Sequence, residues 1–256
     1  MLLALDVGNT NVTIGTFEGG RLTANWRLRT VHDQTTDEWG VLFRNLFALA
    51  GLDIGAVDGI IVASVVPPLD SALDAMARRY FHTEPVFVSA ETDLGLAIRY
   101  DNPSEVGADR LVNAVAAFAR YGGPCVVVDL GTAITFDVIS RQGEYLGGII
   151  AAGIAISIEA LFSKTARLPL VDFRAPARLI GTNTVGAIQS GLYYGALGMI
   201  DGIVERLVAE LGPDTNCVAT GGQAQLIARG SRYLTHIDEN ITLEGLELIW
   251  ERLQKA

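Results

Sequence analysis

The sequence contains little of what marks secreted, membrane-spanning or nucleic-acid-binding proteins. Two cysteines in 256 residues are too few for a disulfide framework, so we expect both to be buried, reduced thiols. The formal net charge is −10 and no cluster of lysine and arginine offsets it, which disfavours binding to nucleic acid or to an anionic membrane surface. The longest apolar run, residues 146–162, is broken by several glycines and by Glu159, so it is a poor membrane span.

Other absences narrow the class of protein further. The chain reaches Asp6 too soon for a signal peptide, and we therefore expect a cytoplasmic protein. No Gly-Lys-Ser/Thr sequence supplies the lysine of a P-loop. The three histidines, His32, His82 and His236, fit no metal or catalytic-triad spacing. Half of the residues are hydrophobic, so we expect a substantial core in one large or two modest domains.

The most informative stretch lies at the start of the chain, in residues 2–13. Four apolar residues run into Asp6 and then into a Gly-Asn-Thr-Asn turn, after which Val12 and Ile14 restore the apolar pattern. This predicts a buried strand, a turn and a second strand, with Asp6 at the end of the first. Gly8 and Asn9 suit a tight hairpin because both residue types tolerate positive φ.

Such a turn can bind phosphate. Its backbone N–H groups and hydroxyls can donate to phosphate oxygens, and a carboxylate at its mouth can hold Mg²⁺ directly or through water. The alternative is an Asx turn in an ordinary hairpin, with Asp6 bonded to its own backbone.

A second copy of this pattern occupies residues 125–137. An apolar strand leads into Asp129, Gly131 and Thr132 and then into another strand-like run, about half the chain length after the first copy. Two copies at this spacing predict a duplicated domain with two carboxylates facing one cleft. A third strand, in residues 218–224, runs into Gly221 and Gly222, a turn that can approach a base or a ribose closely.

Asp109 and Arg110 begin a helix that the apolar spacing predicts over 109–121. Asp109 is either an ordinary helix-capping residue or a base that accepts the proton of an attacking hydroxyl. The helix N-terminus is expected to keep Asp109 ionised, and hence a weak base. Arg110 is either a solvated surface residue or a bidentate clamp on a carboxylate.

Four glycines share one face of a helix predicted within 181–207. They are Gly191, Gly195, Gly198 and Gly202. Each glycine costs about 1 kcal/mol relative to alanine in a helix interior, so close helix–helix packing is expected to offset them. The packing partner is either another part of the same chain or the same helix of a second subunit.

Six short motifs stand in order along about the first two hundred residues: 5–10 (LDVGNT), 63–67 (ASVVP), 100–103 (YDNP), 107–110 (GADR), 129–132 (DLGT) and 184–191 (TVGAIQSG). Together they resemble the type III pantothenate kinase family, within the superfamily of sugar kinases, heat-shock ATPases and actin. The resemblance implies an α/β fold of duplicated ribonuclease H-like (actin-like ATPase) domains, with mixed sheets flanked by helices. We place the N-terminal half at 1–118 and the C-terminal half, with a dimerisation helix, at 119–256.

The resemblance also implies residue roles in ATP-dependent phosphorylation of pantothenate, the first step toward coenzyme A. Asp109 is the catalytic base, Asp6 organises Mg²⁺ around ATP, and Asp129 ligates a monovalent cation, K⁺ or NH₄⁺. The implied ATP-binding residues are Asp6, Val7, Gly8, Asn9, Thr10, Asn11, Val12, Thr13 and Thr132. The implied pantothenate-binding residues are Tyr100, Gly107, Ala108, Asp109 and Arg110, with Thr184 reaching the pantothenate of the partner in a homodimer.

Three alternatives stay open at this stage. One is a transcriptional accessory factor of the same fold, although the acidic charge argues against direct DNA contact. Another is an ATPase scaffold of the heat-shock or actin type, for which the chain lacks the length. The nearest chemical alternative is a kinase of another small hydroxylated acid. The sequence also departs from the family where Ala152 precedes Gly153 in place of the usual proline, which makes that turn less rigid.

Overall fold

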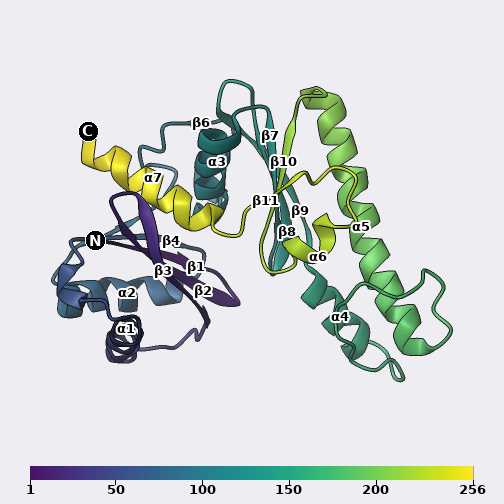
Figure 1. Ribbon diagram of the computed structural model, residues 1–256, viewed down its shortest axis with the longest axis horizontal. Helices are drawn as coiled ribbons and strands as arrows, with labels where there is room; N and C mark the ends of the chain where they lie inside the picture. Colours follow the sequence, from purple (N-terminus) through teal and green to yellow (C-terminus); the bar gives the residue numbers. More distant parts are fainter. Residues whose placement is uncertain (256) are drawn as a thin grey trace. The chain divides into compact units, whose positions relative to one another are not determined.

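The computed structural model describes residues 1–255. They form a mixed α/β protein whose chain divides into two compact units, and Figure 1 labels the helices and strands of both. The first unit comprises Met1–Ala116 and the segment from Ile241 onward, and the second comprises Ala117–Asn240. No helix among residues 1–255 is both long and apolar enough to cross a membrane.

The first unit is built on a mixed five-stranded sheet with the strand order β3-β2-β1-β4-β5. Its first three strands form an antiparallel meander, and β4 and β5 continue the sheet in parallel with β1. The strands are β1 (Leu2–Val7), β2 (Asn11–Glu18), β3 (Arg21–Arg29), β4 (Gly59–Ser64) and β5 (Pro85–Phe87). The central strand β1 is buried over its whole length except at Asp6, as its continuous apolar run predicts.

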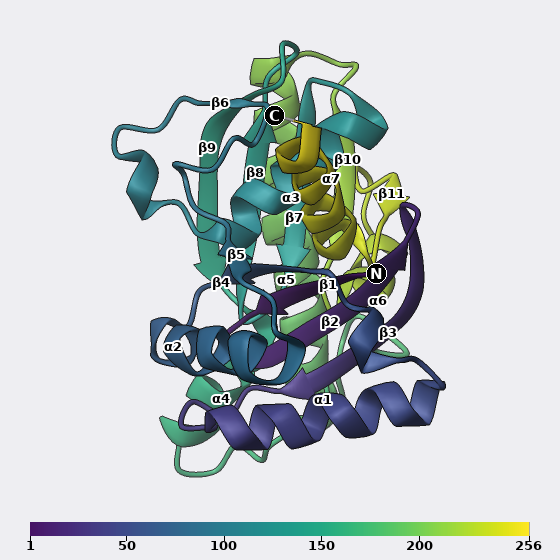
Figure 2. The same ribbon diagram turned by 90° about the vertical axis from the view of Figure 1, so that its left-hand side faces the viewer.

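Helices cover both faces of this sheet. The helical segments and one short extra strand of the first unit are α1 (Thr36–Ala50), η1 (Ile54–Ala56), α2 (Pro67–Met76), the π-helical turn η2 (Ala77–Phe81), β6 (Ala97–Ile98), η3 (Pro103–Glu105) and α7 (Ile241–Lys255). The helix α3 (Ala108–Tyr121) contains the boundary between the units. Figure 2 shows α1 and α2 side by side along the sheet, and α7 contacts β1 and β4.

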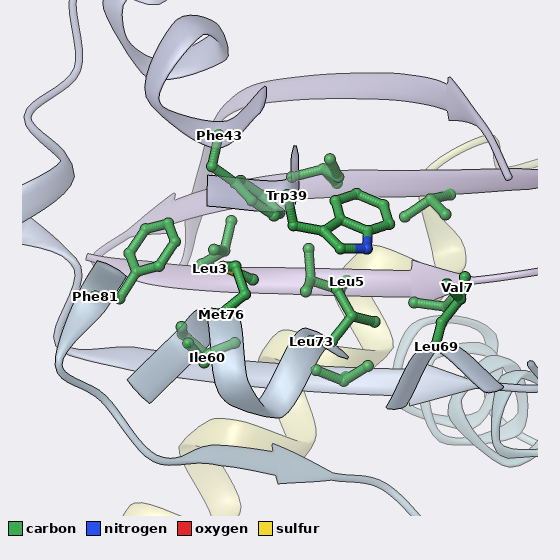
Figure 3. Packing of buried hydrophobic residues seen from close by; sticks show 14 of the residues in the cluster. Leu3, Leu5, Val7, Trp39, Phe43, Ile60, Leu69, Leu73, Met76 and Phe81 are labelled. Atoms are coloured by element: carbon green, nitrogen blue, oxygen red, sulfur yellow. The ribbon is translucent and has the colours of Figure 1, made fainter. Parts of the chain in front are cut away.

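The core of the first unit lies between the sheet and the helices α1 and α2. Figure 3 shows Leu3 and Leu5 of β1 near Phe43 and Trp39 of α1, and Val7 beside Leu69 of α2, all in one cluster. The large buried side chains of α1 are spaced four residues apart, at Trp39, Phe43 and Phe47, and Gly40 is buried beside them.

Leu49, near the C-terminus of α1, does not belong to this buried face. Its side chain is 85% exposed, because it lies six residues beyond Phe43 and so on the other side of the helix. The N-terminus of α1 is fixed by a capping box between Thr35 and Glu38.

The second unit repeats the topology of the first. Its strands are β7 (Cys125–Leu130), β8 (Ala133–Ile139), β9 (Glu144–Ala152), β10 (Asn216–Thr220) and β11 (His236–Ile237). They lie in the order β9-β8-β7-β10-β11, with the same antiparallel meander and the same parallel continuation. Even the irregularity recurs, since the register shifts between Thr16 and Phe17 in β2 and between Val138 and Ile139 in β8. The duplication predicted from the two Asp-x-Gly turns is therefore present in the fold.

Three helices accompany the second sheet: α4 (Ile154–Ser163), α5 (Thr184–Leu211) and α6 (Ala224–Ala228). Ile200 and Val204 of α5 pack against Val128, Ile134 and Phe136 of the sheet. The glycine face of α5, formed by Gly191, Gly195, Gly198 and Gly202, takes no part in this packing. A Cβ atom added at Gly191, Gly195 or Gly198 would meet no atom within 4 Å, and one at Gly202 would meet only Arg206 Nη1 at 3.5 Å.

The units differ from the predicted domains at 1–118 and 119–256 in the place of the C-terminal helix. The helix α7 belongs with the first unit, where Leu243 packs against Gly15 and Trp250 against Gly59. An added Cβ at Gly245 would collide with the backbone of Val112, so α7 also packs tightly on α3. The assignment of the units as actin-like ATPase halves is an interpretation of their shared topology.

Candidate active site

The first candidate element is the turn between β1 and β2, which contains the predicted phosphate-binding residues. Asp6 and Val7 end β1, Gly8, Asn9 and Thr10 form the turn, and the remaining predicted residues, Asn11, Val12 and Thr13, begin β2. The Gly8 N–H donates to Asn11 O at 3.0 Å. Asp6 is half-buried and pairs directly with Thr13 across the hairpin.

The conformation of this turn corrects one expectation. Gly8 and Asn9 do not adopt positive φ, whereas Gly19 and Gly20 in the next turn do. The requirement at Gly8 is for space instead, because an added Cβ would lie 3.1 Å from Asn11 O.

Thr30 holds the turn from outside, and nothing in the sequence analysis identified it. Its N–H donates to Thr10 O at 3.0 Å and its hydroxyl donates to Gly8 O at 2.6 Å. Thr30 follows β3 and is buried. A threonine just after a third strand in a meander is the only sequence signal, and it is weak.

The predicted base lies at the start of α3. Asp109 is half-buried, and its Oδ1 accepts the N–H of Arg110 at 2.8 Å. Gly107 is close to this carboxylate, since an added Cβ there would lie 2.5 Å from Asp109 Oδ1. Arg110 is only 7% exposed, which excludes the solvated surface residue considered above. Ala108 is buried and Tyr100 is half-buried, in the irregular segment before η3.

The electrostatics of Asp109 differ from the sequence expectation. Burial raises the pKa of Asp109 above its ordinary value, and this outweighs the opposing effects of the Arg110 N–H and the Arg110 charge. The prediction that the helix N-terminus keeps Asp109 a weak base is therefore wrong in direction. A raised pKa makes the ionised carboxylate a stronger base.

In the first unit, Val65 lies between the turn after β1 and the segment that carries Asp109. The Val65 N–H donates to Val7 O at 3.0 Å, next to Asp6. The same residue's Cγ1 would lie 3.3 Å from a Cβ on Gly107. Val65 follows β4, in the motif at 63–67, and it connects the end of the central strand to the segment that carries the predicted base.

In the second unit, Asp129 and Thr132 occupy the places that correspond to the first turn. Asp129 is half-buried near the end of β7, and Thr132 is exposed in the turn. Gly221 lies against Asp129: it adopts φ +88°, and an added Cβ would collide with Asp129 Oδ1 and lie 2.7 Å from Leu130 C. The Gly-Gly turn after β10 therefore packs directly against the Asp129 carboxylate.

Gly153 fits against the same turn. An added Cβ would collide with Thr132 O, so only glycine fits there. Ala152 is the last residue of β9 and pairs with Ala133.

Thr184 lies at the N-terminus of α5, after the N-cap Asn183, whose side chain accepts the Gly186 N–H at 2.8 Å. It borders a cavity of about 830 Å³, which is also lined by Leu161, Leu168, Asn183, Ile188 and Gly191. The cavity wall is mostly apolar and continues onto the glycine face of α5.

Comparisons with known proteins identify the family. The model of the type III pantothenate kinase family matches residues 2–206. The type III pantothenate kinase of Solibacter usitatus (strain Ellin6076) is 70% identical over 252 residues, covering 98% of this chain and 97% of its own. That of Koribacter versatilis (strain Ellin345) is 56% identical over 264 residues, covering 99% and 96%.

Two solved structures show the same fold at low identity. The ethanolamine utilization protein EutJ of Carboxydothermus hydrogenoformans superposes with a TM-score of 0.59 at 15% identity, covering 96% of this chain and 89% of its own. The activator of the 2-hydroxyisocaproyl-CoA dehydratase of Clostridium difficile, with bound ADPNP, gives 0.57 at 13% identity, covering 100% and 97%. The predicted actin-like fold class is thereby confirmed.

Proposed function

The chain belongs to the type III pantothenate kinase family, and we propose that it transfers the γ-phosphoryl group of ATP to the primary hydroxyl of pantothenate. The product is 4′-phosphopantothenate, and the reaction is the first step of coenzyme A biosynthesis. The observation that supports this most strongly in the structure is the position of Val65, because its N–H donates to Val7 O beside the first turn while its side chain lies close to Gly107, next to the half-buried Asp109.

A kinase of this family uses ATP with a divalent metal ion. The first turn has N–H groups and hydroxyls that can bind phosphate, and the Asp6 carboxylate can bind the metal ion. Asp6 is half-buried and can organise Mg²⁺, which takes one or two carboxylates and keeps its other ligands as water and phosphate. Residues 1–255 contain no group of three or more acidic, histidine or cysteine side chains that could hold a metal, which fits an ion that arrives with the nucleotide. The remaining ATP ligands in this proposal are residues 7–13 of the first unit, and the role expected of Thr132 stays a prediction.

Asp109 is the base that accepts the proton of the pantothenate hydroxyl. Its raised pKa matches this task better than that of an ordinary surface aspartate. Arg110 is the group that recognises the pantothenate carboxylate, and Tyr100, Gly107 and Ala108 complete the pocket. Phosphoryl transfer needs positioning and charge stabilisation more than covalent chemistry, so a single carboxylate suffices as base.

Asp129 binds a monovalent cation, K⁺ or NH₄⁺, in this proposal. The chain has no P-loop lysine, and a bound cation supplies positive charge that the transferring phosphoryl group requires. A carboxylate oxygen is a suitable ligand for such an ion, and the close approach of Gly221 keeps the side chain in place.

The protein is a homodimer that packs through α5 in this proposal, with Thr184 reaching the pantothenate of the partner. Among residues 1–255, an added Cβ would meet no atom within 4 Å at three of the four glycines and only Arg206 Nη1 at Gly202, so packing within the monomer does not explain them. Leu179, whose backbone carbonyl accepts the Ser190 hydroxyl of α5, and the adjoining Ile180 expose large apolar side chains, at 63% and 77%. The location in the cytoplasm stays a prediction, as does the expectation that nucleic acid is no partner.

The test is ATP consumption with pantothenate, Mg²⁺ and K⁺, beside an Asp109→Asn variant and a K⁺-free control. We expect turnover that requires pantothenate and is lost in the variant. Other hydroxylated acids, such as pantoate and glycerate, serve as competing substrates. ATP binding without pantothenate-dependent turnover, or equal turnover of another acid, would refute the proposed reaction and leave the fold intact.

A further inference from the structure

A buried polar network lies beside Asp129 in the second unit. Asp137 and Tyr145 are both fully buried, and the Tyr145 hydroxyl donates to Asp137 Oδ1 at 2.9 Å. The Thr135 hydroxyl donates to the other oxygen, Asp137 Oδ2, at 3.2 Å. A buried carboxylate is costly unless it is hydrogen-bonded, so a network of this kind is kept in place by its own partners.

Thr135 connects this network to Asp129. Thr135 of β8 and Asp129 of β7 are directly paired across the two strands, so their side chains share one face of the sheet. Directly opposed residues have Cβ atoms about 4.5–5.5 Å apart, a separation at which two side-chain oxygens can contact one ion. Both are half-buried, whereas Asp137 and Tyr145 lie deeper.

The bond to Asp137 fixes what the Thr135 hydroxyl can offer to a ligand. A threonine hydroxyl has one hydrogen and two lone pairs. Because Thr135 gives its hydrogen to Asp137, its oxygen has only lone pairs left for a ligand. A carboxylate and an acceptor-only hydroxyl suit a cation bound by oxygen, or an ammonium ion that donates hydrogen bonds.

The first unit supplies an internal comparison. It has the equivalent pair, Asp6 opposite Thr13, but the position two residues further along the strand is Gly15. An added Cβ there would meet Leu243 Cδ1 at 2.9 Å and Leu22 Cδ1 at 3.0 Å. The duplicated hairpins therefore share the Asp–Thr pair, and the buried carboxylate with its tyrosine is present in the second copy only.

We propose that Thr135 is a ligand of the monovalent cation beside Asp129, and that Asp137, held by Tyr145, is the positioning residue that orients the Thr135 hydroxyl. This inference rests on the proposed role of Asp129 as cation ligand. It adds the Thr135 hydroxyl to the Asp129 carboxylate as a second ligand, and the buried Asp137 and Tyr145 hold that hydroxyl in place. Outer partners of this kind commonly change metal affinity by about 10–100-fold when they are removed.

The experiment measures cation binding directly. Tl⁺, a surrogate for K⁺, is titrated into the protein with Mg²⁺ and a non-hydrolysable ATP analogue and followed by ²⁰⁵Tl NMR, and the rise in Tm with K⁺ over Na⁺ is recorded in parallel. The variants are Thr135→Val, Thr135→Ser, Asp137→Asn and Tyr145→Phe. The control is Thr215→Val, which removes a hydroxyl that bonds Gly212 O in the loop after α5.

We expect Thr135→Val and Asp137→Asn to weaken Tl⁺ binding by about tenfold or more and to abolish the K⁺-dependent rise in Tm. Thr135→Ser is expected to restore binding, because it keeps the hydroxyl. The control is expected to bind Tl⁺ like wild type. Should Asp137→Asn fail to fold, Thr135→Val and the milder Tyr145→Phe carry the test.

Wild-type Tl⁺ affinity in Thr135→Val would overturn the inference, provided that Asp129→Asn abolishes binding. If Asp129→Asn itself binds Tl⁺ normally, the assignment of Asp129 is wrong, and the inference fails with it. Absence of pantothenate-dependent turnover in a wild-type protein that binds Tl⁺ would refute the proposed reaction while leaving the cation site established.

Discussion

The glycine face of α5 allows a prediction whose sign depends on what covers it. Replacing glycine by alanine in a helix interior stabilises the helix by about 1 kcal/mol when the new methyl group meets nothing. The Cβ positions at Gly195 and Gly198 are open in the single chain. The double variant Gly195→Ala/Gly198→Ala should therefore stabilise the isolated chain by about 2 kcal/mol.

A dimer packed on this face reverses the sign. The two-fold axis places each substitution twice in the interface, so four methyl groups enter closely packed space. Overpacking costs about 1–3 kcal/mol for each group, which gives about 4 kcal/mol or more for the dimer. Since 1.4 kcal/mol corresponds to a tenfold change, the dimer dissociation constant should rise by about a thousandfold.

Two measurements separate these contributions. Sedimentation at several protein concentrations gives the dimer dissociation constant, and urea unfolding over the same range separates chain stability from association. Glu210→Ala, in the exposed last turn of α5, is the control. A double variant that remains dimeric with unchanged affinity and gains about 2 kcal/mol would show that the glycine face points to solvent, and the dimer proposed here would be wrong.

Three further predictions concern single residues. Because burial raises the pKa of Asp109, kcat/KM should fall as the pH drops through a value above that of an ordinary aspartate, and Asp109→Asn should lower kcat by about 10²–10⁴; an acidic limb at the ordinary value would contradict this. Burial and the neighbouring Glu251 raise the pKa of Glu247 from 4.5 to about 7, so stability falls as the pH rises from 4.5 to 7, because only the unfolded chain loses the proton there. Glu247→Gln should thus stabilise the protein above pH 7 by about 1–2 kcal/mol and have little effect below pH 4.5. The full pKa shift corresponds to about 3 kcal/mol, and relaxation of the side chains lowers this value. Equal effects at both pH values in chemical denaturation would refute the prediction. Gly221→Ala forces a strained φ and displaces Asp129, so it should destabilise the chain by about 1–3 kcal/mol and weaken K⁺ activation, whereas unaltered K⁺ dependence would separate the turn from the cation.

Local patterns were sufficient to predict the elements that carry the candidate site. Strand β1 is buried on both faces, so its continuous apolar run is unambiguous, and the polar turn after it follows directly. The same reasoning located β7 and its turn, and the repeat of both gave the duplication. Periodicity likewise predicted α3 within one residue of its start.

Long-range packing was out of reach of the same reasoning. The helix α7 is amphipathic, but amphipathicity does not say which of two similar sheets it covers, and the predicted boundary placed it with the wrong one. The pKa of Asp109 could not be predicted for the same reason. The helix N-terminus is visible in the sequence, whereas the burial that dominates its pKa depends on segments far away in the chain.

The two units also show where function is added to a duplicated fold. The order of the five corresponding strands and the bulge are the same in both, and so is the Asp–Thr pair at the hairpin. The differences lie elsewhere. Between the third and fourth strands the first unit has α1 and one short turn, whereas the second has α4 and the long, glycine-faced α5.

The positions beside the hairpins differ as well, with Gly15 in one copy and Asp137 in the other. Neither difference is needed to form the sheet, because the first unit forms the same sheet without them. One difference is a helix face on which added Cβ atoms would meet almost nothing, and the other is a buried carboxylate that accepts the Thr135 hydroxyl. The features that distinguish the copies are therefore the ones to mutate first, since changes there test function with the least disturbance of the shared fold.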